Sequence, residues 1–321
     1  MATTGLTSQA YGENSTAKMQ AVLMQSIWLA LLIAILLLLL QLPIREIALQ
    51  IVDSSNQVEQ FAAVYFDIRI WSAPATLINY AILGWLIGRE ASKAALLMVL
   101  VINVSNIVLD GVFVLGLGMN VDGVALASVM AEYTGLVLGL WLLRHYGLST
   151  HGIRISLSKQ VWKQSRHGLH VHGNVMIRTF VLISCFALFT TQGARQGDIV
   201  LAANSVLLNF ITFMAFVLDG FANATETLSG KAIGRRSPVM LQQALKLTAF
   251  WSVLMAVLFS LSYLLFGHGM IRLLTGIDAV IEFAEIHLVW VIIAPLIAVW
   301  SYLLDGLFVG ATRSREMRNT M

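Results

Sequence analysis

Three polar side chains follow one face of an otherwise apolar stretch in the first half of the chain. Asn103, Asn106 and Asp110 are spaced i, i+3 and i+7, so a helix over 95–117 would place them in one stripe. A carboxylate flanked by two amides can ligate a cation, and a buried carboxyl can also take up and release a proton. The alternative is a hydrogen-bonded cluster that holds helices together. The stripe therefore predicts either cation or proton binding, or helix packing.

Four more acids lie inside apolar stretches, namely Glu132, Asp219, Glu226 and Asp305. Asp219 and Asp305 are each followed by glycine, as Asp110 is, and a glycine beside a carboxylate permits close helix approach. A charge at bilayer depth costs roughly 2.5–3.5 kcal/mol, so each acid needs a functional or structural role. Asp305, Asp219 and Glu132 are therefore candidates for a second acidic site within the membrane, with packing as the alternative.

Two arginines lie within these stretches as well. Arg178 is a lone cation deep in its stretch and needs a neighbouring acid, for which Asp219 and Asp305 both qualify. Arg69 is predicted to pair with Asp67 near the outer end of a helix. The sequence does not decide which of these two acids pairs with Arg178.

The composition of the chain predicts the helices that carry these residues. The chain of 321 residues is 58% hydrophobic and 12% charged, with a mean hydropathy of +0.80, whereas soluble domains contain about 25% charged residues. A bilayer core needs about 20 apolar residues per helix. Eight stretches meet this requirement: 21–42, 61–88, 95–117, 123–143, 170–191, 199–228, 245–266 and 283–311. The sequence predicts an all-α polytopic membrane protein in a lipid bilayer, with kinks at Pro74 and Pro295.

Composition also excludes several classes of protein. Cys185 is the only cysteine, so no internal disulfide can form, and no Cys/His cluster has metal-ligand spacing. His167, His170 and His172 have no acid nearby in the sequence, which disfavours a membrane-embedded enzyme such as an acyltransferase. The pI of 9.1 indicates basic loops facing a negatively charged leaflet. We expect no enzyme activity, no metal or cofactor, no nucleic-acid partner and no obligatory protein partner.

The basic residues predict the orientation in the membrane. Fifteen of the twenty Lys and Arg residues lie on one side of the eight stretches. The opposite side has three, Arg45, Arg195 and Arg272, and the other two lie within the stretches. Cytoplasmic loops carry the excess of Lys and Arg, so the first side is predicted to face the cytoplasm.

The chain resembles itself at an offset of 222 residues. Residues 5–12 resemble 227–234, and Ala73-Pro74 matches Ala294-Pro295 at an offset one residue shorter. The matched stretches are six helices apart, which indicates parallel six-helix repeats, a common plan of transporters. The same offset predicts a fragment of a protein of about twelve helices, truncated at both ends. We predict an N-lobe over 1–145, a cytoplasmic inter-lobe loop over 146–168 and a C-lobe over 169–321.

Several segments resemble the MATE family of multidrug and toxin extrusion transporters, in particular its DinF branch. They are T-T-G-L-T-S-Q-A-Y-G at 3–12, N-I-V-L-D at 106–110, L-D-G-F-A at 218–222, and Y-L-L-D-G at 302–306 with G-A-T-R at 310–313. The resemblance covers the whole chain, from within the family's second helix to just after its tenth. It implies two lobes of helices that export organic cations and other drugs in exchange for H⁺ or Na⁺.

The resemblance also implies roles for particular residues. Asn106 and Asp110 correspond to residues of the family's N-lobe cation site, and Ser128 to a hydroxyl on its sixth helix. Asn79 lies near an asparagine of the fourth helix. Asp305 lies in the tenth helix, where some members place an ion-site acid. The resemblance and the polar stripe together give a predicted cation or proton site of Asp110, Asn106, Asn103, Ser128 and Asn79.

The sequence departs from the family in two places. The aspartate of the family's first helix has no counterpart in this chain. Asn174 and Arg178 stand in the region where other branches carry a seventh-helix acid. The second departure disfavours a sodium site in the C-lobe and favours protons as the coupling ion.

The sequence is interpreted as a secondary active antiporter that exports drugs or organic cations in exchange for H⁺, with Na⁺ as the alternative ion. Its partners would be a small-molecule substrate and the bilayer. One alternative is a flippase for lipid-linked oligosaccharides, which would need a basic cavity, while Arg178 is the one basic residue at depth. The other alternative is an inactive fragment of the transporter.

Overall fold

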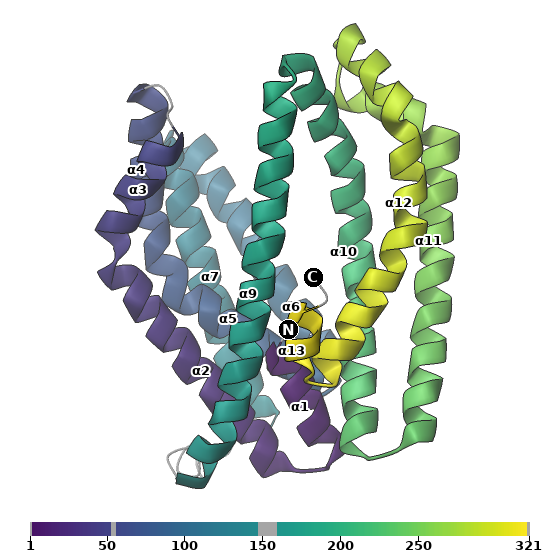
Figure 1. Cartoon of the computed structure of the whole chain (residues 1–321). Helices are drawn as coiled ribbons and strands as arrows, with labels where there is room; N and C mark the ends of the chain where they lie inside the picture. Colours follow the sequence, from purple (N-terminus) through teal and green to yellow (C-terminus); the bar gives the residue numbers. More distant parts are fainter. Residues whose placement is uncertain (1, 53–55, 147–158, 320–321) are drawn as a thin grey trace. The chain divides into compact units, whose positions relative to one another are not determined.

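The computed structural model describes residues 2–52, 56–146 and 159–319 (Figure 1). Nearly all of these residues are helical, and no strand occurs among them. Eight helical segments in the described ranges are long and apolar enough to cross a bilayer: Thr16–Leu39, Gln57–Gly88, Ser92–Gly116, Val121–His145, His170–Arg195, Asp198–Gly234, Pro238–Leu274 and Asp278–Gly310. The predicted all-α membrane fold with eight spans is confirmed.

Large apolar side chains lie exposed along these helices. Leu39, Phe180 and Trp290 are 75%, 72% and 69% exposed, respectively. A large continuous apolar surface is unusual on a protein in water, whereas the hydrocarbon of a bilayer accommodates it. The exposed faces therefore fit lipid contact.

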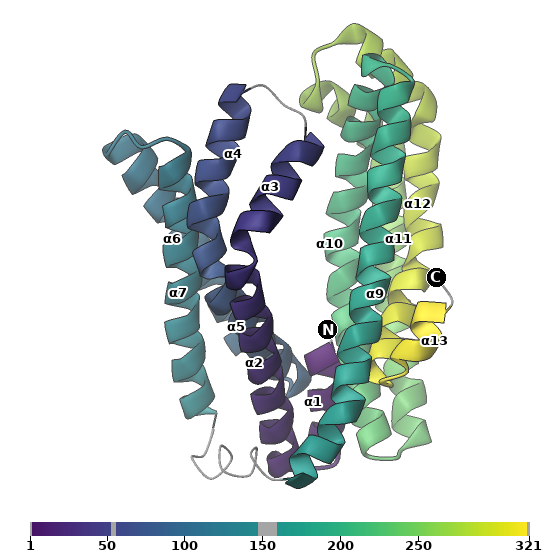
Figure 2. The ribbon, with the colours of Figure 1, turned by 60° about the vertical axis from the view of Figure 1, so that its left-hand side comes forward.

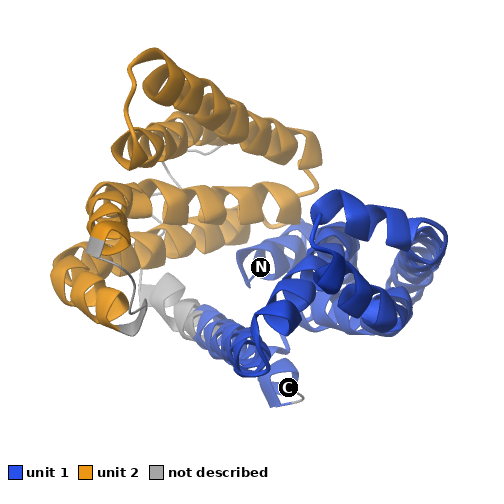
Figure 3. Ribbon diagram, turned by 90° about the horizontal axis from the view of Figure 1, so that it is seen from above, with its two compact units in different colours: residues 1–14, 167–321 blue, residues 15–166 orange. Residues whose placement is uncertain are grey.

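The described residues form two compact units (Figure 3). One contains residues 15–166, and the other contains residues 1–14 together with 167–321. Most of the predicted inter-lobe loop, residues 147–158, lies outside the described residues. α9 (Lys159–Arg195) begins at Lys159, within the stretch that was predicted to be loop. The lobe boundaries at 145 and 169 stay a prediction.

Two prolines shape the unit of residues 15–166. A proline ring clashes with the carbonyl four residues before it, which is that of Leu39 for Pro43 and that of Ile70 for Pro74. Accordingly, one helix ends at Leu39 and a short 3₁₀ turn begins at Ile70. The elements of this unit are α2 (Thr16–Leu39), α3 (Gln41–Val52), α4 (Asn56–Arg69), η1 (Ile70–Ser72), α5 (Ala73–Gly88), α6 (Ser92–Asp110), the π-helical η2 (Gly111–Gly116) and α7 (Val121–His145).

Small residues bring α6 and α7 close together. A Cβ added to Gly135 of α7 would lie 2.3 Å from the Ile102 side chain of α6, so no larger residue fits there without a shift. Gly139, one turn further, meets Met98 in the same way at 2.9 Å. Because apolar burial drives little association in lipid, close approach of this kind is a main source of helix packing. The close approach of α6 and α7 places the polar faces of these two helices next to each other.

The second unit consists of α1 (Ala2–Gly12), α9 from residue 167 on, α10 (Asp198–Gly234), α11 (Pro238–Leu274), α12 (Asp278–Gly310) and α13 (Ser314–Asn319). Pro295 lies inside α12, as predicted, and leaves the Val291 carbonyl without its helical donor. Ser260 of α11 donates a hydrogen bond to the neighbouring carbonyl, that of Ile292. Figure 2 shows α13 beside α9, where Asn174 donates to Ser314 and accepts from Arg318.

Glycines pack α1 against α10 and α12. A Cβ on Gly5 would lie 2.3 Å from the Val309 carbonyl oxygen, and one on Gly234 would lie 2.1 Å from the Gln9 carbonyl oxygen. The sequence alone grouped residues 1–14 with the N-lobe, whereas the structure packs them with residues 167–321. The small-residue contacts are the physical reason, since they let the backbones of these helices touch.

Candidate functional site

The predicted partners Asn106 and Ser128 meet between α6 and α7. The Asn106 amide nitrogen donates to the Ser128 hydroxyl oxygen over 3.3 Å. Asp110 lies one turn beyond Asn106 on α6, and Glu132 lies one turn beyond Ser128 on α7, so each helix continues the polar stripe. The structure thus brings together two helices whose polar faces were predicted separately.

Asp110 is the last residue of α6 and is half-buried. Its Oδ1 atom is buried and has no hydrogen-bond partner among the described residues. The helix continues directly into the π-helical turn Gly111–Gly116, a feature that sequence analysis did not anticipate. π-helical turns often occur at functional sites because they alter the i, i+4 hydrogen-bond ladder. A buried carboxylate oxygen without a partner can accept a proton or contact a cation.

Glu132 is held by α5 and faces an arginine. The Asn79 amide nitrogen donates to both the carboxylate Oε2 and the main-chain oxygen of Glu132, each over 2.9 Å. Asn79 itself is 2% exposed. The Arg69 Nη2 atom lies 3.7 Å from Glu132 Oε1. These two partners of Glu132 lie 53 and 63 residues earlier in the chain, so the sequence around Glu132 does not reveal them.

The predicted pair of Asp67 and Arg69 is wrong. Asp67 instead pairs with Arg45 of α3, with 2.7 Å between Oδ2 and Nη1. Residues i and i+2 of a helix do not face each other, so Arg69 points to a different neighbour, Glu132.

Asn103 lies apart from the other predicted site residues. Its side chain is exposed, and its amide donates to the Val99 carbonyl of the same helix over 3.0 Å. Within the stripe, Asn106 is the residue whose side chain forms a hydrogen bond to another helix. A role of Asn103 in cation binding stays a prediction.

The second unit contains a buried ion pair. The Arg178 Nη2 atom of α9 lies 2.8 Å from Asp305 Oδ1 of α12, and both side chains are 13% exposed. Asp219 of α10 interacts electrostatically with both. Two carboxylates therefore lie near one guanidinium. Of the two partners left open by the sequence, Asp305 makes the direct contact.

Glu226 of α10 is buried. It is 2% exposed, and its Oε1 has no hydrogen-bond partner within the described part of the chain. The Gly5 backbone lies against it, while Lys231 stacks on the Tyr11 ring at 5.4 Å. No group of three or more His, Cys, Asp or Glu able to hold a metal ion occurs among the described residues.

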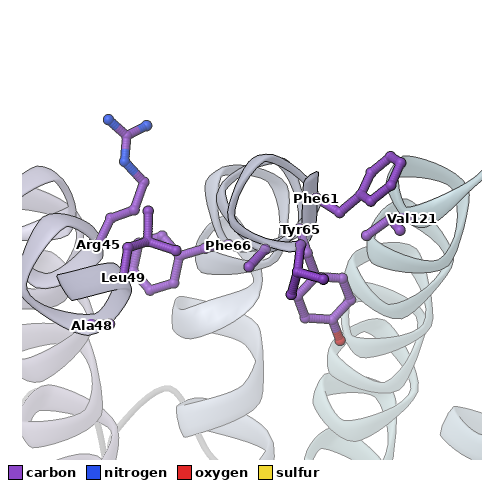
Figure 4. Close-up of a pocket in the computed structure, with 9 residues that line it drawn as sticks. Arg45, Ala48, Leu49, Phe61, Tyr65, Phe66 and Val121 are labelled. Carbon is purple, nitrogen blue, oxygen red and sulfur yellow. The ribbon is translucent and has the colours of Figure 1, made fainter. Parts of the chain in front are cut away.

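An apolar pocket of about 460 Å³ lies in the unit of residues 15–166 (Figure 4). Phe61, Tyr65 and Phe66 of α4 line it, together with Leu49 of α3 and Val121 at the start of α7. Pockets of about 300–1,000 Å³ accommodate drug-sized molecules.

Comparisons with known proteins extend over most of the chain. The family model MatE matches residues 1–112 and 175–317. The chain is 43% identical over 322 residues to DNA damage-inducible protein F of Escherichia coli (strain K12), covering 100% of this chain and 70% of that protein. It is 25% identical over 256 residues to Protein DETOXIFICATION 42 of Arabidopsis thaliana, covering 77% of this chain and 47% of that protein.

Solved structures share the fold. The Vibrio cholerae MATE transporter VcmN in its bent form has a TM-score of 0.86 at 20% sequence identity, covering 99% of this chain and 72% of that one. A MATE solved in complex with MaD5 has a TM-score of 0.88 at 17% identity, covering 99% and 71%. Since the family model spans most of the chain and the bacterial relative aligns along all of it, the chain belongs to the MatE family of multi-pass membrane transporters.

Proposed function

We propose that this protein is an antiporter of the bacterial inner membrane that exports amphiphilic organic cations in exchange for protons, with Asp110 as the proton-carrying group. The observation that carries the proposal is the buried, unpartnered Oδ1 of Asp110, next to the hydrogen-bonded pair of Asn106 and Ser128. Protonation removes the charge of a carboxylate and gives it a hydrogen-bond donor. The protonated and ionised forms of Asp110 would therefore favour different conformational states of the transporter.

Exchange follows if proton and drug favour different states of the transporter. Each ligand shifts the equilibrium between inward-facing and outward-facing states only by its differential affinity for the two. The pocket beside α4 has a volume suitable for a drug-sized molecule, and Arg45, its charged lining residue, is paired with Asp67. Family membership supports transport, and the relatives' names, such as DETOXIFICATION, support toxic small molecules as the class of substrate.

Protons are favoured over sodium because of the second unit. Asp305 is already paired with the Arg178 guanidinium at 2.8 Å, which repels a metal cation from that carboxylate. The same pair weighs against a flippase for lipid-linked oligosaccharides. Arg178 is the deep basic residue that such a substrate would need, and its charge is directed at Asp305.

The proposal is tested in liposomes that contain the purified protein under an imposed pH gradient. Ethidium movement is followed by its fluorescence, and proton movement by a pH-sensitive dye. Wild-type protein should couple the two fluxes, and Asp110→Asn should abolish coupling while the protein stays folded. Asp198→Asn, which removes an exposed carboxylate at the start of α10, serves as the matched control.

Two results would overturn the proposal. Coupled flux in the Asp110→Asn protein would remove Asp110 as the coupling group. Loss of ethidium export when choline replaces Na⁺ at constant pH would make sodium, and not the proton, the coupling ion.

A further inference from the structure

Arg69 and Glu132 form a loose ion pair in the unit of residues 15–166. Their closest nitrogen and oxygen atoms are 3.7 Å apart, whereas charge-assisted contacts of this kind are usually about 2.7–2.9 Å. The Arg178–Asp305 pair of the other unit, at 2.8 Å, reaches that range. Arg69 is 30% exposed at its side chain, and Glu132 is 15% exposed. The longer contact leaves the Glu132 carboxylate open to a competing cation.

The carboxylate of Glu132 is held in one orientation. The Asn79 amide nitrogen donates to Oε2 and to the main-chain oxygen of the same residue. Asn79 is almost completely buried, so this anchor is shielded from water. The other carboxylate oxygen, Oε1, is the one that faces Arg69. Glu132 therefore presents one preorganised oxygen to a positive charge.

Two further oxygens on α5 lack donors. The Oδ1 atom of Asn79 and the hydroxyl oxygen of Thr76 are both buried without a hydrogen-bond partner among the described residues. Thr76 and Asn79 are three residues apart and so lie on the same face of the helix. A buried acceptor without a donor is costly, and most are satisfied by protein, water or ligand. A ligand that supplies N–H donors would satisfy these two oxygens on the α5 face beside Glu132.

We propose that Glu132 binds the cationic head group of an exported drug, and that Arg69 is a tethered cation that competes for the same oxygen. This inference rests on the proposed export of organic cations and assigns the residues that select them. A protonated amine fits because it supplies a positive charge for the carboxylate and N–H donors for the unpartnered Asn79 oxygen. A quaternary ammonium supplies the charge alone.

Arg69 keeps a partner when a ligand displaces it. Its Nη1 atom donates to the hydroxyl of Ser72, which in turn donates to the Arg69 carbonyl over 2.8 Å. A guanidinium that leaves Glu132 therefore remains hydrogen-bonded. This matters because an unpaired buried charge would oppose displacement. A ligand must displace Arg69 from Glu132 in order to bind. A cation with a low affinity for Glu132 therefore fails to bind.

The test measures binding to purified protein in detergent, without a pH gradient. Octylammonium and octyltrimethylammonium share a charge and a chain but differ in N–H donors, and each displaces ethidium as a fluorescent tracer. Wild-type protein should bind octylammonium more tightly than octyltrimethylammonium. Arg69→Gln should raise the affinity for octylammonium by about tenfold, because a close competing charge is gone. Glu132→Gln should weaken binding by about tenfold and remove the preference between the two probes.

The control is Arg272→Gln in the other unit, which breaks an exposed contact of 3.4 Å with Glu285. If Arg69→Gln changes affinity no more than this control does, the pair is structural and the proposal is overturned. If Glu132→Gln does not fold, Arg69→Lys should keep wild-type affinity while Arg69→Gln raises it. Equal affinities for these two variants would also overturn the proposal. Binding that behaves as expected in a protein without drug-driven proton flux would overturn the proposed function alone.

Discussion

The Arg178 guanidinium lies 2.8 Å from the Asp305 carboxylate, and each side chain is only 13% exposed. The two residues are 127 positions apart and join α9 to α12 within one unit. A second acid, Asp219, interacts with the same guanidinium from α10. Arg178 therefore connects three helices through charge. Without Arg178, the Asp305 carboxylate would lie in a low-dielectric environment with no cation beside it.

Removing Arg178 should destabilise the protein strongly. Arg178→Gln leaves Asp305 buried without its cation, and breaking a buried pair from one side costs about 3–5 kcal/mol. Thermal unfolding in detergent, followed by tryptophan fluorescence, should show a marked decrease in Tm. The double variant with Asp305→Asn should recover part of the loss. A decrease no larger than that of Arg272→Gln, which removes an exposed charge, would contradict a stabilising role.

The glycine contacts of α10 should tolerate no methyl group. A Cβ at Gly234 would lie 2.1 Å from the Gln9 carbonyl oxygen, a backbone atom that cannot rotate away. Gly234→Ala should therefore lower Tm by separating α1 from α10. The matched control is Gly220→Ala on the same helix, where nothing lies within 4 Å of the added Cβ. Alanine at that position should be neutral or stabilise by up to about 1 kcal/mol, because it favours the helix. Equal effects of both variants would argue against the packing role.

Loss of the Ser128 hydroxyl should impair coupling more than folding. Ser128→Ala removes the acceptor of the Asn106 amide, and a net hydrogen bond contributes about 0.5–1.5 kcal/mol. Drug-driven proton flux in liposomes should decrease by up to about tenfold. Ser205→Ala is the control, since that exposed hydroxyl bonds only the Leu201 carbonyl of its own helix. Unchanged flux in the Ser128 variant would separate this hydroxyl from the coupling site.

The bias of basic residues should determine which loops face the cytoplasm. In a Cys185→Ala background, Arg236→Cys lies in the turn between α10 and α11, on the basic side. Gly276→Cys lies in the turn between α11 and α12, on the side with few basic residues. A membrane-impermeant maleimide added to intact cells should label only the second variant. Labelling of the first alone would reverse the assigned orientation.

Local rules predicted much of the fold. The length and hydropathy of each stretch predicted the eight spans, because a bilayer of fixed thickness demands about 20 apolar residues per helix. The kink at Pro74 and the position of Pro295 inside α12 follow from the ring of proline and its missing N–H. The face shared by Asn106 and Asp110 follows from the period of the α-helix alone.

Tertiary structure decided which polar groups meet. Periodicity places Glu132 on one face of α7, but it does not say which helix lies opposite. The structure supplies Asn79 and Arg69 there, from two other elements. It also departs from regular helix directly after Asp110, where the π-helical turn begins. No pattern of residue types in one helix carries this information.

The sequence by itself determined how many helices cross the membrane, where prolines interrupt them and which side chains share a face. The pairing of Arg178 with Asp305, of Arg69 with Glu132, and of α1 with α10 required the tertiary structure. The reason is that apolar faces are nearly interchangeable in lipid, so hydropathy does not select neighbours. Helix neighbours are chosen by short-range complementarity, such as Gly234 against the Gln9 backbone, and these contacts then decide which buried charges find each other.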